Sequence, residues 1–447
     1  MFRAVLVANR GEIARRVFRA CRRLGVGSVA VFSEADRDAP HVRDADRAVL
    51  LGPAPARESY LDVERILDAA RRTGADAVHP GYGFLSENWR FAEACAGAGL
   101  TFIGPPVEAI RAMGDKSHAR HLMAAAGVPT VPGSSGPVAD ATAAEAIATG
   151  IGFPLILKAA AGGGGIGMAR VERPADLAAA FAGAARRAQA AFADGALYLE
   201  RYLERPRHVE VQVFADTHGA VVHVHERECS IQRRHQKLIE ESPAPGLDPE
   251  TKRGLTEAAV AGARSIGYVN AGTLEFLLDA AGRFYFIEMN TRIQVEHPVT
   301  EEVTGLDLVV EQLRVAAGEP LRWRQDEITQ RGWAVECRVY AEDPERNFLP
   351  SPGTLTRLDV PAGEGLRVES GVEAGGAVSV HYDPLLFKLV ARGDGREEAL
   401  ARMRAALDAT VVEGVRTTVP FLRRVLEHPD VRRGALHTQM VEQGAFR

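Results

Sequence analysis

Acidic and amide side chains gather on two strand patterns that follow each other near the middle of the chain. Gly272–Leu278 and Arg283–Asn290 are rich in aromatic and apolar residues and predict the two strands of a hairpin. Glu288 and Asn290 are two residues apart and face the same side of their strand, and a two-residue turn would place Glu275 opposite Glu288. Clustered carboxylates beside aromatic side chains need a counter-ion, and hard oxygen ligands suit Mg²⁺. The pattern favours a metal site at this hairpin over a solvated strand face.

Two polar segments could extend this site. The loop after the second strand carries a guanidinium, an amide and a carboxylate at Arg292, Gln294 and Glu296. Upstream, Glu226–Lys237 is dense in charged and polar side chains and has little apolar periodicity. Taken alone, this second segment is equally compatible with a solvated helix, so its part in a site stays open at this point.

A glycine-rich segment offers chemistry of a different kind, because backbone N–H groups can bind phosphate oxygens. Gly162–Gly167 formally matches the dinucleotide pattern GxGxxG, which requires a strand before it and a helix after it. Here Met168–Val171 predicts a second strand, so the segment is interpreted as a hairpin tip that covers nucleotide phosphates, as the flap of protein kinases does. A flexible loop is the alternative, and Lys158 on the preceding strand favours phosphate binding.

The scarcity of lysine draws attention to the positions where it remains. The chain has 54 basic residues, of which only five are lysines: Lys116, Lys158, Lys237, Lys252 and Lys388. A lysine that persists against this bias is a candidate for a place that needs a compact ammonium rather than a planar guanidinium. Lys252 is an exception, because its surroundings predict an exposed first helical turn.

Length and composition bound the class of protein. With 447 residues, 46% hydrophobic and 25% charged, the chain has the composition of a soluble globular protein, and its length predicts about three domains. The net charge of -5 gives no support for nucleic acid or a membrane as a partner, and no apolar run approaches the roughly 18 residues of a membrane span. Four widely spaced cysteines without a CxxC pair predict a cytoplasmic protein with neither a zinc site nor disulfides.

The elements that would position these residues alternate in type. Over roughly the first hundred residues, short apolar strands alternate with amphipathic helices, which predicts a parallel sheet with crossover helices. A smaller α/β unit follows, and strand patterns dominate the rest. The sequence therefore predicts a mixed α/β protein with these parts: residues 1–113, a helical linker at 114–129, and further units at 130–203, 204–332 and 333–447.

At this point the sequence resembles a known family. Arg227–Lys237 reads RECSIQRRHQK, Glu288–Glu301 reads EMNTRIQVEHPVTE, and His79–Asn88 reads HPGYGFLSEN. Together with Ala8–Ala14 and the glycine-rich segment, these motifs closely resemble biotin carboxylases, the ATP-grasp enzymes of acyl-CoA and pyruvate carboxylases. The resemblance covers essentially the whole chain. It implies an ATP-grasp fold made, in order, of a Rossmann-like N-terminal domain, a small mobile lid, a catalytic core and a β-rich C-terminal domain.

The resemblance also implies the reaction and the residues that bind its reactants. ATP and bicarbonate would form carboxyphosphate, and the ureido nitrogen of biotin would then be carboxylated. The residues that would bind ATP are Lys116, Lys158, Gly163, Gly164, Gly165, Glu200, Leu203, His208, Gln232 and His235. The ligands of Mg²⁺ (or Mn²⁺) would be Glu275, Glu288 and Asn290. Bicarbonate would be held by Lys237, Arg292, Gln294 and Val295.

Two residues have the most direct catalytic roles by this resemblance. Glu296 matches the general base that removes the bicarbonate proton, and Arg338 would stabilise the negative oxygen that develops on biotin. Lys237 and Arg292 complete the catalytic set. Tyr82 and Asp383 would border the biotin pocket.

The partners follow from what the chain does not contain. None of its five lysines has a methionine neighbour, which is the setting in which the family's carrier module attaches biotin. The carboxylase portion also leaves no room for a carboxyltransferase. We therefore expect biotin to arrive on a separate biotin carboxyl carrier protein, with carboxyltransferase subunits as further partners. The chain would be a homodimeric ligase subunit of an acetyl-CoA or other acyl-CoA carboxylase, as in fatty acid biosynthesis.

Two other functions are weighed against this one. A different ATP-grasp ligase, of the carbamoyl-phosphate or purine-pathway type, would share the Lys158 segment and the carboxylate hairpin but not the long motifs. A non-catalytic ATP-binding scaffold would have lost a catalytic residue or a metal ligand, and none is lost. The sequence departs from the family pattern at Ile166, where many relatives have a basic residue, and at Arg201, where lysine is common.

Overall fold

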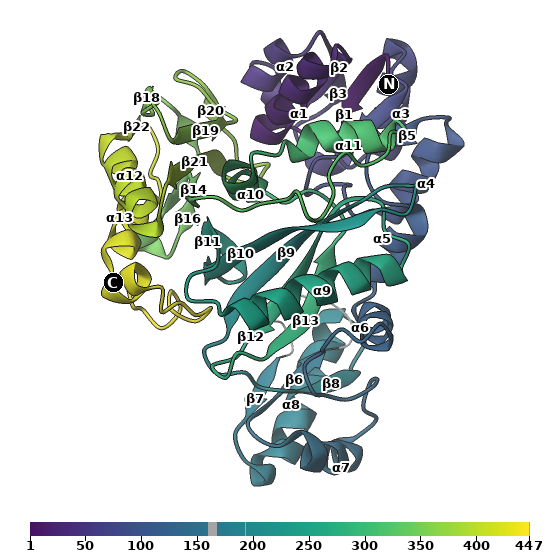
Figure 1. The fold of residues 1–447 in the computed structure, drawn as a ribbon, viewed down its shortest axis with the longest axis vertical. Helices are drawn as coiled ribbons and strands as arrows, with labels where there is room; N and C mark the ends of the chain where they lie inside the picture. The colour runs from purple at the N-terminus through teal and green to yellow at the C-terminus, as the bar shows by residue number, and fades with distance from the viewer. Residues whose placement is uncertain (160–167, 193, 447) are drawn as a thin grey trace.

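Three large sheets and the helices packed on them make up most of the molecule (Figure 1). This computed structural model describes residues 1–159, 168–192 and 194–446. The glycine-rich segment, with the predicted phosphate contacts Gly163, Gly164 and Gly165 and the departure at Ile166, lies outside the described residues. The predicted mixed α/β class is confirmed.

The N-terminal sheet is parallel and has the strand order β3-β2-β1-β4-β5. Its strands are β1 (Ala4–Val7), β2 (Gly27–Ser33), β3 (Arg47–Gly52), β4 (Ala77–His79) and β5 (Thr101–Phe102), and its helices are α1 (Gly11–Leu24), α2 (Pro40–Asp44), α3 (Val63–Thr73), α4 (Trp89–Gly97) and α5 (Val107–Gly114). The predicted parallel sheet is confirmed. Its edge strand β3 is not predicted by the sequence, because only Val49 and Leu51 of its side chains are buried.

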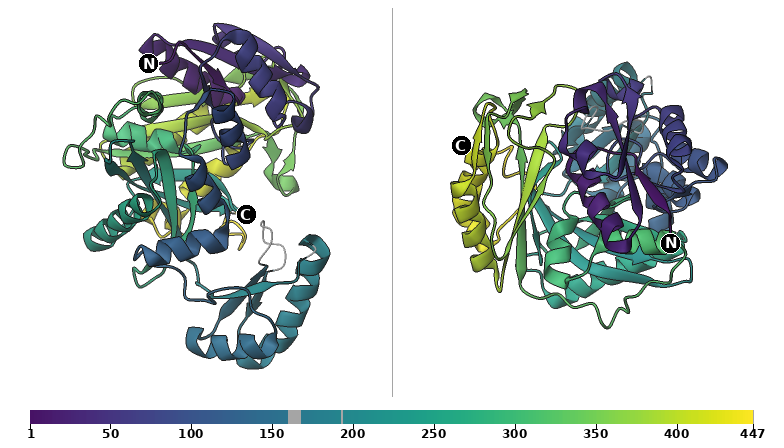
Figure 2. Two further views of the ribbon diagram at one scale, coloured as in Figure 1. Left: turned by 90° about the vertical axis from the view of Figure 1, so that its right-hand side faces the viewer. Right: turned by 90° about the horizontal axis from the view of Figure 1, so that it is seen from above.

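A smaller antiparallel sheet of order β7-β6-β8 forms a unit that projects from the rest of the molecule in the left view of Figure 2. Its elements are α7 (Ala141–Ile151), β6 (Leu155–Ala159), β7 (Ala169–Val171), α8 (Leu177–Phe192) and β8 (Leu197–Arg201), and α6 (Lys116–Ala125) precedes them. The two strands predicted on either side of the glycine-rich segment are confirmed, and they pair with each other.

The third sheet has eight strands in the order β13-β12-β9-β10-β11-β14-β21-β19. They are β9 (Arg207–Ala215), β10 (Val221–Arg233), β11 (Gln236–Ser242), β12 (Asn270–Leu278), β13 (Phe284–Asn290), β14 (Trp333–Tyr340), β19 (Leu366–Ser370) and β21 (Leu385–Gly393). Because β11 pairs with β14, one hydrogen-bonded sheet crosses the predicted boundary between residues 332 and 333. The units predicted on the two sides of this boundary therefore share a sheet.

Helices cover this sheet, and short strands follow in the C-terminal part of the chain. The helices are α9 (Pro249–Ser265), α10 (His297–Thr304), α11 (Leu308–Ala316), α12 (Arg396–Ala409), α13 (Val419–Glu427) and α14 (Pro429–Arg433), and the short strands are β15 (Glu342–Asp343), β16 (Leu349–Pro350), β17 (Gly353–Thr354), β18 (Arg357–Asp359), β20 (Ala377–Val378) and β22 (Val411–Glu413). None of the helices in the described ranges combines the length and the apolarity that crossing a membrane requires.

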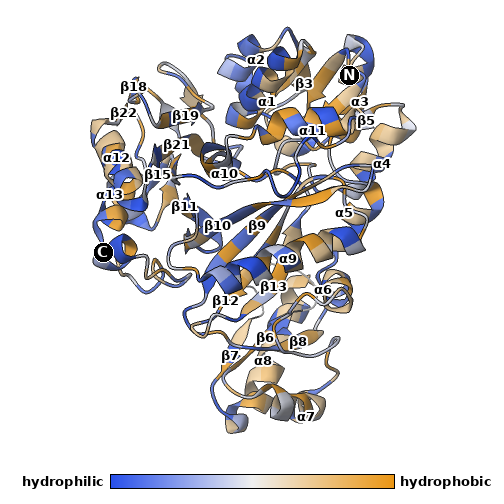
Figure 3. Cartoon of the chain, in the orientation of Figure 1, coloured by the Kyte–Doolittle hydropathy of each residue, from blue (hydrophilic) through white to orange (hydrophobic). Residues whose placement is uncertain are grey.

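Strand β9 shows how one face of the large sheet comes to carry polar side chains. Its sequence alternates, so its three valines pack into the hydrophobic core with the apolar side of α9, while His208, Glu210 and Gln212 face the opposite side. Figure 3 shows hydrophilic and hydrophobic residues mixed along β9 and β10. The apolar face supplies the burial that holds the strand in place, which leaves the other face for polar groups.

The polar segment Glu226–Lys237 is not a solvated helix, so that alternative is wrong. It forms the second half of β10 and the start of β11, which turn back on each other through Arg234 and His235, both with positive φ angles (48° and 67°). Side chains from Glu226 to Gln232 are buried, because partners from distant parts of the chain satisfy them. Strand β11 itself is not among the predicted strands.

Phe276 tests how strongly the core beneath the hairpin stabilises the large sheet. Its side chain is fully buried and meets Phe284 and Phe286 edge-to-face, with ring centroids 5.6 and 6.2 Å away. We expect Phe276→Ala to lower the free energy of unfolding by about 3–5 kcal/mol, since it removes a buried ring and leaves a cavity. Leu349→Ala, at a side chain that is 51% exposed, should change it by less than about 0.5 kcal/mol. Urea denaturation followed by circular dichroism compares the two, and equal effects would contradict this account.

Candidate active site

A single buried ammonium stands at the centre of the polar face of the large sheet. Lys237 on β11 donates from Nζ to Glu210 at 2.5 Å, to Glu275 at 2.8 Å and to Glu296 at 2.6 Å. We call these four residues the Lys237 cluster. Both Glu210 and Glu296 are fully buried, and Glu275 is nearly so. Three other parts of the fold, β9, β12 and the residue before α10, therefore each bring a carboxylate to one cation on β11.

Glu296 is held by two cations at once. It occupies the position just before α10, where its Oε1 accepts from Lys237 and its Oε2 accepts from Arg338 on β14 at 2.9 Å. The same Arg338 nitrogen lies 2.5 Å from Oε1 of Glu240. The predicted base and the predicted oxyanion-stabilising residue are thus in direct contact.

Two residues of this face were not identified from the sequence. Glu210 bridges Lys237 and Arg227, accepting at 2.5 Å from Nε of Arg227, and Arg227 also donates to Gln212 at 2.8 Å and to Thr300 at 3.0 Å. Arg227 is fully buried. The strict alternation of polar and apolar residues along β9 is the signal that could have pointed to Glu210.

The predicted hairpin register is confirmed, although the predicted turn is wrong. Glu275 and Glu288 are partners across β12 and β13. The strands are joined through Asp279–Arg283, where the N–H of Asp279 donates to the carbonyl of Arg283. This connection is longer than a two-residue turn. A register shift after Glu275 compensates for the difference and brings the two carboxylates opposite each other.

The three predicted metal ligands are close in the fold but differ in surroundings. Asn290 donates from Nδ2 to Oε1 of Glu275 at 2.9 Å, and its Oδ1 accepts from Arg292 at 2.8 Å. Glu288 is half-exposed, and its carboxylate lies 3.4 Å from Nζ of Lys116 at the start of α6. Two carboxylates and an amide oxygen on neighbouring strands form a donor set that suits a hard cation such as Mg²⁺.

Other carboxylates of the face also stand within reach of one another. His208, Glu210 and Glu275 form one group of potential ligands, and Glu210, Cys229 and Glu296 form another. In both groups, however, the carboxylates already share the ammonium of Lys237. The less enclosed edge at Glu288 is the better place for a metal ion, because the ammonium of Lys237 already occupies the space between the interior carboxylates.

The loop after β13 brings the remaining anion-binding candidates together. Arg292 donates to Glu87 at 2.9 Å and lies 3.4 Å from Oε1 of Gln294. Gln294 in turn donates to Glu275 at 2.9 Å. The carbonyl of Val295 accepts from Lys388 at 2.6 Å. Three of the residues predicted to hold bicarbonate, Lys237, Arg292 and Gln294, therefore lie in one connected network around Glu275, and Val295 adjoins it as the residue before Glu296.

The predicted nucleotide contacts fall into two groups. His208 lies 3.0 Å from Glu275, and Gln232 lies 3.0 Å from the other ring nitrogen of His208, which places both at the Lys237 cluster. In the smaller unit, Lys158 on β6 is ion-paired with Glu200 on β8, and Arg120 donates to Glu200 at 2.6 Å.

Four further candidates lie at the margin of this arrangement. Leu203 is half-buried after β8, and His235 is exposed in the turn between β10 and β11. Tyr82 donates its hydroxyl hydrogen to Glu12, while Asp383 is exposed and accepts from the N–H of Leu385. The structure does not bring Tyr82 and Asp383 into contact with each other.

Burial and the neighbouring cations act in opposite directions on the pKa values of the carboxyl groups in the cluster. Burial would raise the pKa of Glu296, but Lys237 and then Arg338 outweigh it and hold the pKa well below its ordinary value. The same balance, again led by Lys237 among the cations, lowers the pKa of Glu275. The surrounding carboxylates outweigh burial at Lys237 itself and raise its pKa. Burial raises the pKa of Glu240 to about 7 despite the opposing effect of Arg338.

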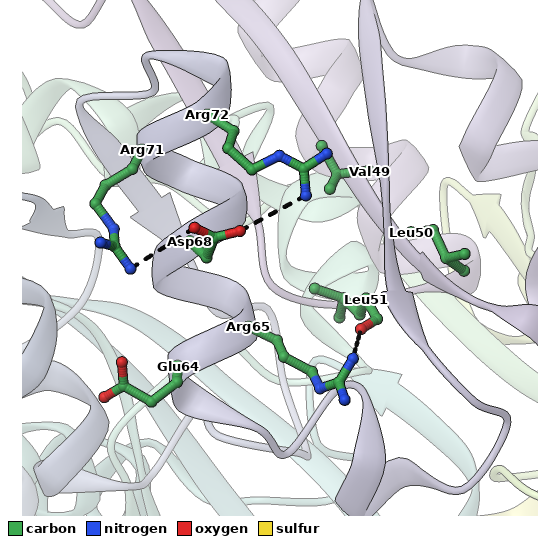
Figure 4. Close-up of a pocket in the computed structure, with 8 residues that line it drawn as sticks. All are labelled: Val49, Leu50, Leu51, Glu64, Arg65, Asp68, Arg71 and Arg72. Carbon is green, nitrogen blue, oxygen red and sulfur yellow. Dashed lines mark hydrogen bonds and ion pairs between the residues drawn. The ribbon is translucent and has the colours of Figure 1, made fainter.

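Two hollows on the surface do not coincide with the cluster. One of about 400 Å³ lies between β3 and α3, where Arg65 donates to the carbonyl of Leu51 (Figure 4). None of its lining residues is a predicted site residue. A second, of about 590 Å³, is lined in part by Glu87, the partner of Arg292. The site is defined by its ion network rather than by these hollows.

This fold and this charged face define an ATP-grasp enzyme, and comparison with known proteins agrees. Residues 115–324 match the family described as the carbamoyl-phosphate synthase L chain, ATP binding domain. Residues 1–110 match the biotin carboxylase N-terminal domain, and residues 336–443 match the biotin carboxylase C-terminal domain.

Individual relatives show the same likeness over the full chain. Biotin carboxylase 2 of Bacillus subtilis is 50% identical over 99% of this chain and 100% of its own length. The biotin carboxylase of Halalkalibacterium halodurans is 51% identical over 99% of this chain and 97% of its own. The crystal structure of a Campylobacter jejuni biotin carboxylase complex has a TM-score of 0.94 and 48% identity, covering 99% of both chains. The chain belongs to the biotin carboxylase family.

The depressed pKa of Glu296 predicts how acid affects the folded protein. A carboxylate with a lowered pKa in the folded state contributes stability above its unfolded value of about 4.5, and this contribution is lost as the pH falls through the folded value. We expect the melting temperature to fall as the pH drops below about 5, and Glu296→Gln to make that fall shallower.

The matched control is Glu108→Gln, since the side chain of Glu108 is 78% exposed. It should leave the pH dependence unchanged. Melting curves recorded by circular dichroism at a series of pH values make the comparison, and equal slopes for Glu296→Gln and the unmodified chain would contradict the assignment.

Proposed function

We propose that the chain catalyses the ATP- and bicarbonate-dependent carboxylation of biotin, the first half-reaction of an acyl-CoA carboxylase. The observation that carries this proposal is the contact of Glu296 with both Lys237 and Arg338, inside a buried face that also holds Glu275. A base, an anion-binding ammonium and an oxyanion-stabilising guanidinium are what bicarbonate activation and biotin deprotonation need. The matches to biotin carboxylase domains at both ends of the chain favour this function over another ATP-grasp ligase.

ATP would lie between the smaller unit and the large sheet. Lys116 and Lys158 would bind its phosphates, together with the backbone of Gly163, Gly164 and Gly165. Glu200 and Leu203 would lie on the adenine side, and further nucleotide contacts would come from His208, Gln232 and His235. Lys158 is now paired with Glu200, so phosphate binding would exchange one anionic partner of the ammonium for another. This exchange needs no new buried charge.

Glu275, Glu288 and Asn290 would hold Mg²⁺ (or Mn²⁺). The ion would neutralise the β- and γ-phosphates during transfer. Glu288 is the ligand whose carboxylate is free of the Lys237 cluster, since its partner is the exposed Lys116. The position of Lys116 beside Glu288 fits a site where phosphate and metal meet.

Bicarbonate would be held by Lys237, Arg292, Gln294 and the backbone of Val295. Glu296, which is ionised, takes its proton, and the bicarbonate oxygen attacks the γ-phosphorus with release of ADP. Each cation that turns from Glu296 toward a bound anion raises the pKa of Glu296 and makes it a stronger base. The carboxyl group of carboxyphosphate then passes to the ureido nitrogen of biotin. The departing phosphate takes up the ureido N–H proton, and Arg338 stabilises the negative ureido oxygen.

Biotin would enter beside Tyr82 and Asp383, carried by a biotin carboxyl carrier protein, and carboxyltransferase subunits would complete the system. A homodimer is supported by one similar structure, the Hydrogenobacter thermophilus 2-oxoglutarate carboxylase biotin carboxylase domain, which is described as a dimer and is 48% identical with a TM-score of 0.92. That structure holds MgADP, ADP and bicarbonate. The four buried, unpaired cysteines of this chain fit a cytoplasmic location.

ADP release tests the proposed function directly. With Mg·ATP, we expect the purified chain to release ADP in a reaction that requires bicarbonate and is stimulated by free biotin. Glu296→Gln should lower the rate by about a hundredfold or more, because the bicarbonate proton then has no acceptor. A coupled assay of ADP measures both. Turnover that ignores biotin would indicate another ATP-grasp ligase, and ATP binding without turnover would indicate a scaffold.

Glu288 offers a separate test of the metal site. Glu288→Gln should raise the Mg²⁺ concentration needed for half-maximal ADP release by about tenfold or more, because the variant loses a charged ligand. The protein should still fold, since the carboxylate lies outside the Lys237 cluster. Glu64→Gln, at an exposed glutamate of α3, is the control. An unchanged Mg²⁺ requirement in Glu288→Gln would remove Glu288 from the ligand set.

A further inference from the structure

Lys388 is a fully buried lysine that the proposed mechanism does not use. It lies on β21, and its Nζ donates to the carbonyl oxygen of Val295 at 2.6 Å and lies 2.9 Å from Oε1 of Glu12. Glu12 belongs to α1 in the N-terminal unit and Val295 to the loop before α10. One ammonium therefore joins three parts of the chain that are far apart in sequence.

The contact with Val295 acts on the peptide that leads into Glu296. A peptide unit is planar, so fixing the carbonyl oxygen of Val295 also fixes the N–H of Glu296 and the direction in which α10 begins. Val295 is one of the residues proposed to hold bicarbonate, and Glu296 is the proposed base. The bond from Lys388 therefore sets the orientation of both without touching either reacting group.

The contact with Glu12 reaches the opposite side of the site. Oε1 of Glu12 also accepts from the hydroxyl of Tyr82, which is proposed to border the biotin pocket. Lys388 is also the cross-strand partner of Arg338, the residue proposed to face the biotin oxygen. The ammonium is thus connected to the bicarbonate loop through Val295 and to the biotin side through Glu12, while the backbone of Lys388 pairs with the strand that carries Arg338.

The chemistry of these contacts requires a compact cation. A carbonyl oxygen and a carboxylate oxygen lie on either side of a fully buried nitrogen, so a neutral side chain would leave both acceptors unsatisfied, and a guanidinium would not match the space of a single nitrogen. The chain uses lysine at only five positions, and this is one of them.

We propose that Lys388 is a positioning residue for biotin carboxylation, holding the Val295–Glu296 peptide and the Glu12–Tyr82 pair in a fixed relation. This inference rests on the proposed function. Lys388 acts through Val295 and Glu12 and contacts neither substrate.

The decisive comparison uses two variants that differ only at Lys388. Lys388→Met alone would leave the Glu12 carboxylate buried without its cation, which destabilises the fold. The double variant Lys388→Met/Glu12→Gln removes both charges together, and Glu12→Gln alone keeps the bond from Lys388 to Val295. Both variants lack the Glu12 carboxylate, so the difference between them isolates the contact of Lys388 with Val295.

We expect the double variant to raise KM for bicarbonate about tenfold or more relative to Glu12→Gln, the effect of losing one charge-assisted hydrogen bond. KM for ATP should stay within about twofold, because the nucleotide contacts lie outside this network. Initial rates of ADP release with free biotin give these constants, and melting curves show that both variants are folded.

Equal KM values for bicarbonate in the two variants would overturn the inference. If the double variant shows no cooperative melting transition, Lys388→Arg decides, since it keeps a counter-ion for Glu12 but misplaces the donor to Val295. A raised KM for bicarbonate is expected there too, and an unchanged KM would overturn the inference. Failure of the proposed function is distinguishable, because the unmodified chain would then release no ADP in response to bicarbonate.

Discussion

The rest of the polar face of the large sheet depends on the ammonium of Lys237. It meets Glu210, Glu275 and Glu296, which are all buried and carry like charges. Without a shared cation, carboxylates at this separation and burial could not all remain ionised. Because each of the three comes from a different element, the ammonium also holds β9, β12 and the start of α10 around β11. The ion pairs of Lys237 thus both compensate the negative charge of the carboxylates and place the predicted base, Glu296.

A face this polar is stable only because the fold is stabilised elsewhere. Along β9 the three valines pack with α9, and the polar residues between them face the Lys237 cluster. The apolar face supplies the free energy of burial, and the polar face adds little net stability, since desolvation largely offsets each buried ion pair. The site can therefore be built from charges that are positioned for chemistry rather than chosen for stability.

The sequence predicts those parts of the site that depend on local geometry. The period of two along a strand places Glu288 and Asn290 on one side. The pairing of Glu275 with Glu288 was predicted from a two-residue turn, and it holds although the turn is longer, because a shift in the strand restores the register. The segment from Glu226 to Lys237 could not be assigned in this way. Its polar side chains are buried against distant partners: Arg227, for example, donates to Thr300, 73 residues away. Local periodicity does not indicate such contacts. Arg227 was missed for the same reason, whereas the alternation along β9 could have pointed to Glu210.

The short helix α10 shows how the three parts of the chain are joined at the site. At its start, Glu296 is held by Lys237 and Arg338. In the middle of the helix, Glu301 accepts from Arg16 of α1 at 2.8 Å, and Arg367 of β19 lies 2.8 Å from its other oxygen. Cations from the N-terminal unit and from strands β11, β14 and β19 of the large sheet thus hold the start and the middle of one helix. A shift of the N-terminal unit against the large sheet would therefore disturb the position of Glu296.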